Sequence, residues 1–368
     1  MALTTEKLSR DQFASLAPEW NKLLESTRAN NPFLRWEWIE SWRHAFEGQC
    51  KHYLLGVRDG NVWIAFAPFA VRRAETRPGF RILEFCGTTE LYPDYMDIIA
   101  APEHEREAVD NLCNFLRNNK QDWDFISFDN LLPDSVLLTH APAACPDWNT
   151  ELRQTSACPV LDMDGTMEQF LGGHFRKKKR YNLKRQVRLL LEEQGCIVVK
   201  ETDPARLDAA LKDFLELHDR RAAAKKINSS IKGEQVRTFL RTVSRRFLDA
   251  GLLELWFLRK DGAPVSALYG FGLADRLYYY QSGVDPDWDR WSAGTVLLTK
   301  VIEYAFQEKF AVFDFLKGDE EYKQTWFTRV QPEYRLRLYR KDARGTLIYG
   351  GHRFISFCRE VRNKLTGK

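Results

Sequence analysis

The two halves of the sequence repeat one pattern of apolar runs and turns. Each half contains two β-rich runs joined by an Asp-Gly turn, at 54–73 and at 253–273, and such runs predict a β-hairpin. A further apolar run, a proline, an amphipathic stretch and a short apolar run ending in Phe-Asp follow in both halves. The matching residues are Pro102 with Pro286, and Phe128-Asp129 with Phe313-Asp314. Their offsets agree to within one residue, so the sequence predicts two copies of one α/β domain.

The boundary between the copies is predicted near 137–154, where proline, alanine and asparagine interrupt the periodicity. We predict an N-terminal domain at 1–150, a C-terminal domain at 151–345 and a basic C-terminal helix at 346–368. The fold class is α/β (α+β): each domain should have a mixed, mostly antiparallel sheet flanked by helices. The second domain contains an additional helical block at 170–250.

A strongly basic helix is predicted within this block, roughly at 176–194. Leucine and valine recur with helical spacing and define one packing face. The other face carries cations and no acid before Glu192. These cations are Arg176, Lys177, Lys178, Lys179, Arg180, Lys184, Arg185 and Arg188. A charged helix face is usually solvated surface, but the uncompensated repulsion here also indicates an anionic partner. Substrate phosphates, an anionic membrane surface and tRNA are the alternatives.

The charge balance and the cysteines exclude several classes of protein. The chain has 368 residues with 55 Lys+Arg against 51 Asp+Glu, and the net charge of +4 is too small for a general nucleic-acid binder. The 7 cysteines are scattered without a C-x-x-C pair, so we expect reduced thiols and no metal site. The first residues lack the apolar segment of a signal peptide, and we therefore expect a cytoplasmic protein.

The order of these elements resembles the GNAT acyltransferase fold. More narrowly, the second half is similar to the GNAT-like proteins of cellulose biosynthesis (the CelD/BcsL type), which are relatives of the Fem-type peptidyltransferases with paired GNAT-like domains. The segments that carry the resemblance are RKKKRYNLKR (176–185), the stretch from Leu217 to Arg221, YYYQSGVDPDW, SAGTVLL (292–298), FDFLKGDEEYKQTW (313–326) and PFLRWEWIESW (32–42). The resemblance implies a GNAT-like N- or O-acyltransferase of exopolysaccharide or cell-envelope biosynthesis.

The resemblance implies a site for acyl-CoA, as a co-substrate, in the second copy. The parallel strands 277–282 and 311–316 would diverge, and N–H groups at the following helix start would bind the pyrophosphate. The residues of this phosphate turn are Arg290, Ser292, Ala293, Gly294 and Thr295. The alternative interpretation is a helix cap with a glycine needed for packing.

The phosphate turn departs from the family pattern at two positions. Asp289 stands where the family has Gln or Arg, and Ser292 stands where it has its first glycine. Arg290 is the neighbouring cation that would compensate the charge of Asp289. In the first copy the corresponding turn, HEREAV (104–109), contains no glycine. We therefore expect the first domain to be structural and non-catalytic.

Catalytic groups are implied in FDFLKGDEEYKQTW, immediately after the second parallel strand. In this fold an amine or hydroxyl attacks a thioester directly, which needs a base for the nucleophile and an acid for the leaving sulfur. Candidate bases are Asp314, Asp319 and Glu320, Tyr322 is the candidate acid, and Lys323 would hold a phosphate or the developing oxyanion. Capping of a turn by Asp314 is the alternative interpretation.

The acceptor is expected to carry phosphates, on a nucleotide or on a lipid, because the basic helix flanks the acceptor groove in Fem-type enzymes. The predicted substrate-binding residues are Lys177, Arg180, Lys184, His218, Arg221, Tyr280 and Gln281. A sugar or polysaccharide precursor fits this description. A lipid-carried acceptor would bring the chain to the inner face of the membrane as a peripheral protein.

Two other classes of function stay open at this point. The basic helix and the altered phosphate turn favour a Fem-like peptidyltransferase that draws on aminoacyl-tRNA. The other alternative is a non-catalytic anion-binding protein that keeps the fold, for which Tyr322 and Lys323 would be replaceable.

Overall fold

The structure is a computed structural model that describes residues 3–74, 79–226, 229, 231–318 and 323–366. The chain divides into two compact units. Unit 1 comprises Met1–Ser156 and Pro332–Lys368, and unit 2 comprises Ala157–Gln331. The sequence predicted boundaries at 150/151 and 345/346 instead. The chain returns to unit 1 earlier than predicted because the strand at 329–340 pairs with a strand of unit 1.

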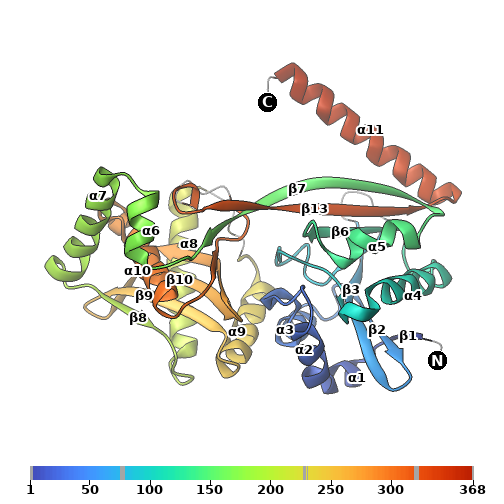
Figure 1. Cartoon of the computed structure of the whole chain (residues 1–368), viewed down its shortest axis with the longest axis horizontal. Coiled ribbons are helices and arrows are strands. Elements are labelled where there is room, and N and C mark those ends of the chain that lie inside the picture. The colour runs from blue at the N-terminus through green and yellow to red at the C-terminus, as the bar shows by residue number, and fades with distance from the viewer. Residues whose placement is uncertain (1–2, 75–78, 227–228, 230, 319–322, 367–368) are drawn as a thin grey trace. The chain divides into compact units, whose positions relative to one another are not determined.

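Unit 1 is built on a mixed sheet whose strands pair in the order β1-β2-β3-β4-β6-β13. Their bounds are β1 Thr4–Lys7, β2 Lys51–Asp59, β3 Val62–Arg73, β4 Arg81–Phe85, β6 Phe125–Leu131 and β13 Arg329–Arg340, while β5 (Ile99–Ala100) pairs with β3. All these pairs are antiparallel except β4 with β6. The helices are α1 Arg10–Ser15, α2 Ala17–Glu25, η1 Pro32–Leu34, α3 Trp36–Ala45, η2 Pro102–His104, α4 Glu105–Asn118, α5 Val136–Ala144 and α11 Ala343–Thr366 (Figure 1).

Unit 2 repeats this plan with the order β7-β12-β11-β10-β9-β8. The bounds are β7 Trp148–Asp162, β8 Ile197–Lys200, β9 Leu253–Lys260, β10 Ala263–Leu273, β11 Arg276–Val284 and β12 Val312–Asp314. Again one pair is parallel, β11 with β12, and the other pairs are antiparallel. The predicted hairpins are therefore β2-β3 and β9-β10. In the second hairpin the turn residues Asp261 and Gly262 have φ of 49° and 84°, as a tight turn requires.

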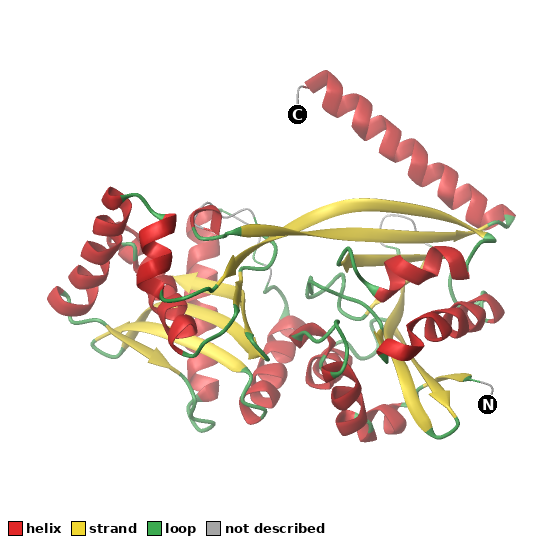
Figure 2. Ribbon diagram, in the orientation of Figure 1, coloured by secondary structure: helices red, strands yellow, loops and turns green. Residues whose placement is uncertain are grey.

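Helices flank the sheet of unit 2 (Figure 2). They are α6 Met167–His174, α7 Lys177–Arg188, α8 Leu207–Lys225, α9 Glu234–Asp249 and α10 Ala293–Gln307, with short helices η3 Leu189–Glu193, η4 Pro286–Trp291 and η5 Lys323–Thr325. Side chains of α6, α7 and α10 share one core with Leu277 and Tyr279 of β11. Phe214 of α8 and Phe247 of α9 pack against rings of β10. Successive residues of a strand point to opposite faces of the sheet. One face therefore packs against α6, α7 and α10, and the other packs against α8 and α9.

The helical block predicted at 170–250 also contains the short strand β8. Its basic helix is α7, which continues directly into a π-helical turn, η3, so that the two together cover the predicted 176–194 to within one residue at each end. The predicted C-terminal helix corresponds to α11.

Candidate functional site

The parallel strands β11 and β12 pair over a short distance and then separate. Their register joins Arg276 with Val312 and ends at Tyr278 with Asp314, although β11 continues to Val284. After Asp314 the chain turns away, because the Phe315 N–H donates to the carbonyl of Pro159 (3.0 Å) and Leu316 has a φ of 53°. Beyond Tyr278, the edge of β11 that faces away from β10 therefore has no strand beside it among the described residues.

A bulge reshapes β11 at the same level. The register between β10 and β11 shifts at Tyr269/Gly270, so that Tyr280 is the extra residue. Gly270 is needed here, since a Cβ atom would lie 2.2 Å from the carbonyl oxygen of Tyr278. The bulge places Tyr279 in the core with α10, whereas Tyr280 packs against Phe271 on the other face.

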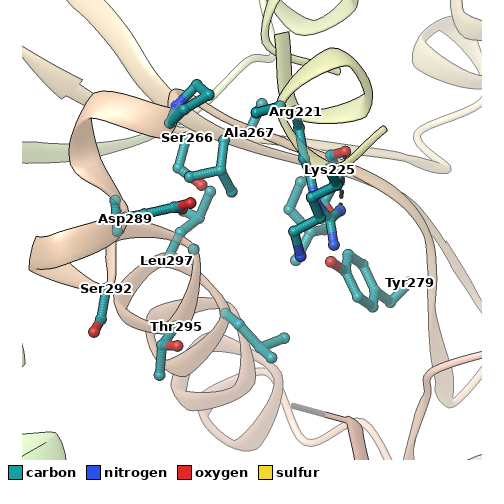
Figure 3. Close-up of a pocket in the computed structure, with 17 residues that line it drawn as sticks. Arg221, Lys225, Ser266, Ala267, Tyr279, Asp289, Ser292, Thr295 and Leu297 are labelled. Atoms are coloured by element: carbon teal, nitrogen blue, oxygen red, sulfur yellow. Dashed lines mark hydrogen bonds between the residues drawn. The ribbon is translucent and has the colours of Figure 1, made fainter. Parts of the chain in front are cut away.

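A cavity of about 220 Å³ opens at this end of the sheet, and we call it the α10 cavity (Figure 3). The N-terminal turn of α10 contributes Ala293, Gly294 and Thr295 to its wall, and β11 contributes Tyr279. Figure 3 shows Arg221 and Lys225 extending from α8 toward Tyr279. Strand β10 completes the wall with Ser266, Ala267 and Leu268. The cavity thus joins a helix N-terminus with two cations.

Ser292 is the N-cap of α10 and adopts the left-handed conformation, with a φ of 57°. Glycine adopts this conformation without strain, so the backbone keeps the shape that the family's glycine implies although a serine is present. The side chain of Ser292 does not cap the helix; its hydroxyl accepts a hydrogen bond from Gln186 of α7 (2.9 Å). The first turn of α10 contains no acid. Its N–H groups and helix dipole can therefore bind an anion.

Gly294 lies close to Val284 in the wall of the α10 cavity. A Cβ atom at this position would be 3.0 Å from Val284 Cγ2. An alanine here would require the Val284 side chain to shift by a few tenths of an ångström, and a bulky side chain would require a larger rearrangement.

The cations of the α10 cavity come from α8, which packs very closely on β11. At Gly283 a Cβ atom would lie 2.6 Å from both the backbone nitrogen of His218 and the Cβ of Leu217. Arg221 donates to the hydroxyl of Ser282, and Lys225 makes no ion pair within the described part of the chain. Lys225 was not among the residues predicted from the sequence, although its i, i+4 spacing from Arg221 places both cations on one face of a helix.

Arg290 does not lie beside Asp289 in the cavity, although the sequence predicted that its charge would compensate that of Asp289. Asp289 lines the α10 cavity, whereas Arg290 does not line it. The guanidinium of Arg290 instead lies 5.2 Å from the ring of Trp291. The positive charge facing Asp289 across the cavity therefore comes from Arg221 and Lys225.

Asp314 is fully buried and both of its carboxylate oxygens are engaged. Arg276 donates to Oδ2 (2.8 Å), and the N–H of Leu316 donates to Oδ1 (2.9 Å). This arrangement is that of a turn cap with an ion pair, which favours the structural alternative for Asp314. The same pair lies beside Tyr278, whose pKa is raised by burial.

Of the remaining candidate catalytic groups, the structure describes Lys323. Its side chain is buried, donates to the carbonyl of Lys317 (3.1 Å) and lies 5.9 Å from the ring of Tyr279. Lys323 is therefore behind a wall residue of the α10 cavity. Asp319, Glu320 and Tyr322 lie outside the described residues.

His218, Gln281 and Arg221 come together where α8 meets β11. Burial lowers the pKa of His218, while the carboxylate of Asp219, whose Oδ1 lies 3.9 Å from Nδ1, opposes this shift. A side-chain hydrogen bond joins His218 to Gln281. Tyr280 packs against rings of β10 instead.

The other three predicted substrate residues line a second, larger hollow of about 730 Å³, which we call the α7 groove. Lys177, Arg180 and Lys184 contribute the basic side, and Glu303, Phe306 and Gln307 of α10 lie opposite. The hydrogen bond between Gln186 and Ser292 joins the other end of α7 to the start of α10. The two helices therefore run in opposite directions along each other.

Comparisons with known proteins agree with this geometry. Residues 177–324 match the family model described as "Acetyltransferase (GNAT) domain". The crystal structure of FemX aligns with a TM-score of 0.62 at 10% identity, covering 90% of this chain and 96% of that chain. The structure of L-PGS from Bacillus licheniformis aligns with a TM-score of 0.56 at 11% identity, covering 92% and 93%.

A third solved structure is the C-terminal domain (DUF2156) of a putative lysylphosphatidylglycerol synthetase from Agrobacterium fabrum. It aligns with a TM-score of 0.55 at 12% identity, covering 91% of this chain and 95% of that chain. At these identities the likeness concerns the fold. No curated protein matches the sequence. Among the described residues, no helix has the length and apolar character needed to span a bilayer. The predicted α/β class and two-domain organisation are confirmed, and the chain carries an acyltransferase domain of the GNAT fold.

Proposed function

We propose that the protein transfers an acyl group from a thioester donor, acyl-CoA or an acyl carrier protein, to an amine or hydroxyl of a phosphorylated acceptor. The observation that carries this proposal is the α10 cavity. It lies where β11 leaves β12, at a helix N-terminus that has no acid and faces two cations.

The donor's pyrophosphate would bind the N–H groups at Gly294 and Thr295, close to Arg221 and Lys225 of the cavity wall. The amides of the donor's arm would pair with the edge of β11 beyond Tyr278, as an added strand does. The thioester would then lie near Tyr279, with the buried ammonium of Lys323 behind that ring.

In the reaction, the acceptor's nitrogen or oxygen forms a bond to the thioester carbonyl carbon while its proton passes to a base. The C–S bond breaks, and the leaving sulfur takes a proton. Lys323, whose ammonium lies 5.9 Å from the ring of Tyr279, is proposed to stabilise the developing oxyanion. Tyr322, adjacent in sequence, is proposed as the acid. Asp314 is proposed to hold the turn that carries them, because both of its oxygens are occupied.

Calorimetric titration of acetyl-CoA tests the donor. We expect micromolar binding by the unmodified protein and loss of binding by Gly294→Trp, because the indole would fill the cavity beside Val284. Gly350→Trp on α11 is the matched control, since a Cβ atom there meets nothing within 4 Å. Lys225→Glu provides a second variant at an exposed site if Gly294→Trp unfolds. Absence of binding at millimolar acetyl-CoA would rule out the CoA donor.

The acceptor is proposed to be a sugar or polysaccharide precursor carried on a nucleotide or lipid, in exopolysaccharide or cell-envelope biosynthesis of the CelD/BcsL type. The support is the α7 groove with Lys177, Arg180 and Lys184, none of which pairs with a carboxylate in the described residues. A lipid-carried acceptor would place the protein at the inner face of the membrane. Co-sedimentation with anionic vesicles tests this, with neutral vesicles as the control.

Aminoacyl-tRNA is the second candidate donor. It is favoured by Asp289, which brings a negative charge to the α10 cavity, and by the cations of α7, of which only Arg188 pairs with a carboxylate among the described residues. A gel-shift titration with aminoacyl-tRNA and with uncharged tRNA separates this donor from acyl-CoA.

A further inference from the structure

We propose that the α7 groove binds a nucleoside diphosphate. The role of this ligand in the reaction rests on the proposed function, whereas binding itself can be tested without it. The groove lies along α7 and α10, and it is distinct from the α10 cavity because the two share no lining residue.

The charges of the groove suit two linked phosphates. Lys177 and Lys184 are seven residues apart, which is about 10 Å along a helix, and Arg180 lies between them. The three side chains make no ion pair with a carboxylate in the described part of the chain. Of the two acids that line the groove, Glu303 is already paired with Lys300. A diphosphate therefore meets a row of cations without carboxylate partners among the described residues. The central one is the planar guanidinium of Arg180, which makes a long hydrogen bond (3.4 Å) to the carbonyl of Gly172.

The aromatic side chains of the groove suit a nucleobase. Tyr181 is 66% exposed although it lines the groove, and Phe306 of α10 lines it on the opposite side. An exposed ring beside cations provides a stacking surface that a simple phosphate would not use. Gln307 adds an amide that can both donate to and accept from a base edge.

The size and the remaining polar groups agree with the same ligand. The volume of about 730 Å³ lies within the range of about 300 to 1,000 Å³ that is usual for small-molecule sites. Glu168, in the first turn of α6, offers a carboxylate that can accept hydrogen bonds from ribose hydroxyls.

Two sources share this chemistry. One is the nucleotide of a nucleotide-linked acceptor. The other is CoA bound with its nucleotide in the groove, which would replace the pyrophosphate position proposed at Gly294 and Thr295. Competition separates them: CoA displaces ADP from the groove in the second case, whereas CoA and UDP bind together in the first.

The test is calorimetric titration of UDP, ADP and inorganic pyrophosphate into the full chain. We expect a UDP or ADP Kd below about 1 mM. The double variant Lys177→Glu/Lys184→Glu should weaken binding at least about 10-fold. The matched control is Lys178→Glu/Arg185→Glu, which has the same charge change and the same spacing on α7 but lies outside the groove lining, and it should change binding less than about 3-fold.

Tyr181→Ala reports on the base. It should weaken nucleotide binding several-fold and leave pyrophosphate binding unchanged. Equal losses in the two double variants, or no nucleotide binding at millimolar concentration, overturn the site. Unchanged nucleotide binding by Tyr181→Ala overturns the nucleoside part. If Gly294→Trp loses CoA binding but still binds UDP or ADP, the groove is a site separate from that of the donor. If the unmodified protein binds UDP or ADP but not CoA, the donor proposal fails and the proposal for the groove stands.

Discussion

The helices α4 of unit 1 and α10 of unit 2 occupy the same place in the repeat, between the two parallel strands of each sheet, but their first turns differ in charge. α4 begins with Glu105 and also carries Glu107 in its first turn, whereas the first turn of α10 has no acid. Glu105 pairs with Arg28, so the cation beside α4 is already occupied. The repeat has thus kept the topology while only one copy has kept a helix start that suits an anion.

Aromatic rings pack around the parallel pair of strands in both units. In unit 1, Phe69, Phe85 and Phe128 are buried and pack together, with ring centroids 4.9 to 5.6 Å apart. In unit 2, Phe313, which matches Phe128, likewise packs with Phe315 and Tyr279, at centroid distances of 4.9 and 6.5 Å. Unit 2 also has the α10 cavity, which the small residues Ser266 and Ala267 of β10 line.

The strongest test of this comparison moves the charge of α4 into α10. Thr295 is the third residue of α10, as Glu107 is of α4. Thr295→Glu should weaken acetyl-CoA binding about 30-fold, because a carboxylate would lie beside the donor's phosphates. Calorimetry measures the affinity. Glu107→Thr is the reciprocal control, and it should neither add a second acetyl-CoA site nor change the affinity of the first. Unchanged affinity in Thr295→Glu would show that the phosphates bind elsewhere.

The cations of α8 should have the next largest effect. Lys225→Met and Arg221→Met should each weaken acetyl-CoA binding about 10-fold, since each removes a charge-assisted contact to phosphate. Lys212→Met is the matched control on the same helix, because Lys212 is exposed and only its weak pairing with Glu216 (3.8 Å) is lost. The slope of affinity against salt concentration should fall in the first two variants and not in the control. A similar loss in all three would point to a general charge effect.

A smaller effect of opposite sign is expected at Asp289. Asp289→Asn should strengthen acetyl-CoA binding about 3- to 5-fold, because it removes a negative charge from the cavity wall. The same change should weaken or leave unaltered any binding that uses a cationic group of the ligand. Weaker acetyl-CoA binding by Asp289→Asn would mean that the carboxylate contacts the donor directly.

The smallest effect concerns the pH dependence of the free energy of unfolding. A buried group in unit 1 and a buried group in unit 2 should change it in opposite directions. Burial raises the pKa of Asp97 in unit 1 to about 7, although three backbone N–H groups donate to it. The unfolded chain loses this proton near pH 4, so raising the pH from 4 to 7 removes stability. Between pH 5 and pH 8 the wild type should lose roughly 1 to 3 kcal/mol relative to Asp97→Asn in guanidinium unfolding.

His218 of unit 2 should respond in the other direction. Its pKa is lowered by burial, so the folded state favours the neutral ring and stability falls as the pH drops below about 6.5. His218→Gln should reduce that loss. Parallel pH profiles of the wild type and both variants would contradict the opposition between the units.

The sequence predicted the repeated topology well because hairpin turns and proline positions are local signals. It placed Gly294 at a helix start for the same reason. The role of Asp314 was left open, because only the three-dimensional contacts with Arg276 and Leu316 show that its oxygens are occupied. Lys225 and the distance of Arg290 from the α10 cavity depend on how α8 packs on β11, and that packing is not a local property of the sequence.

The division of the chain has a consequence for engineering. Unit 2 is an insertion into unit 1, and its entry and exit are neighbours: the N–H of Thr328 donates to the carbonyl of Val160 (2.9 Å), and Arg329 pairs with Asp162. Because the chain leaves unit 1 and returns to it at neighbouring points, the fold of unit 1 does not depend on the length of the segment inserted between them. The acyltransferase module should therefore be exchangeable as a cassette, cut at 156/157 and 331/332, for the corresponding segment of another protein with this fold.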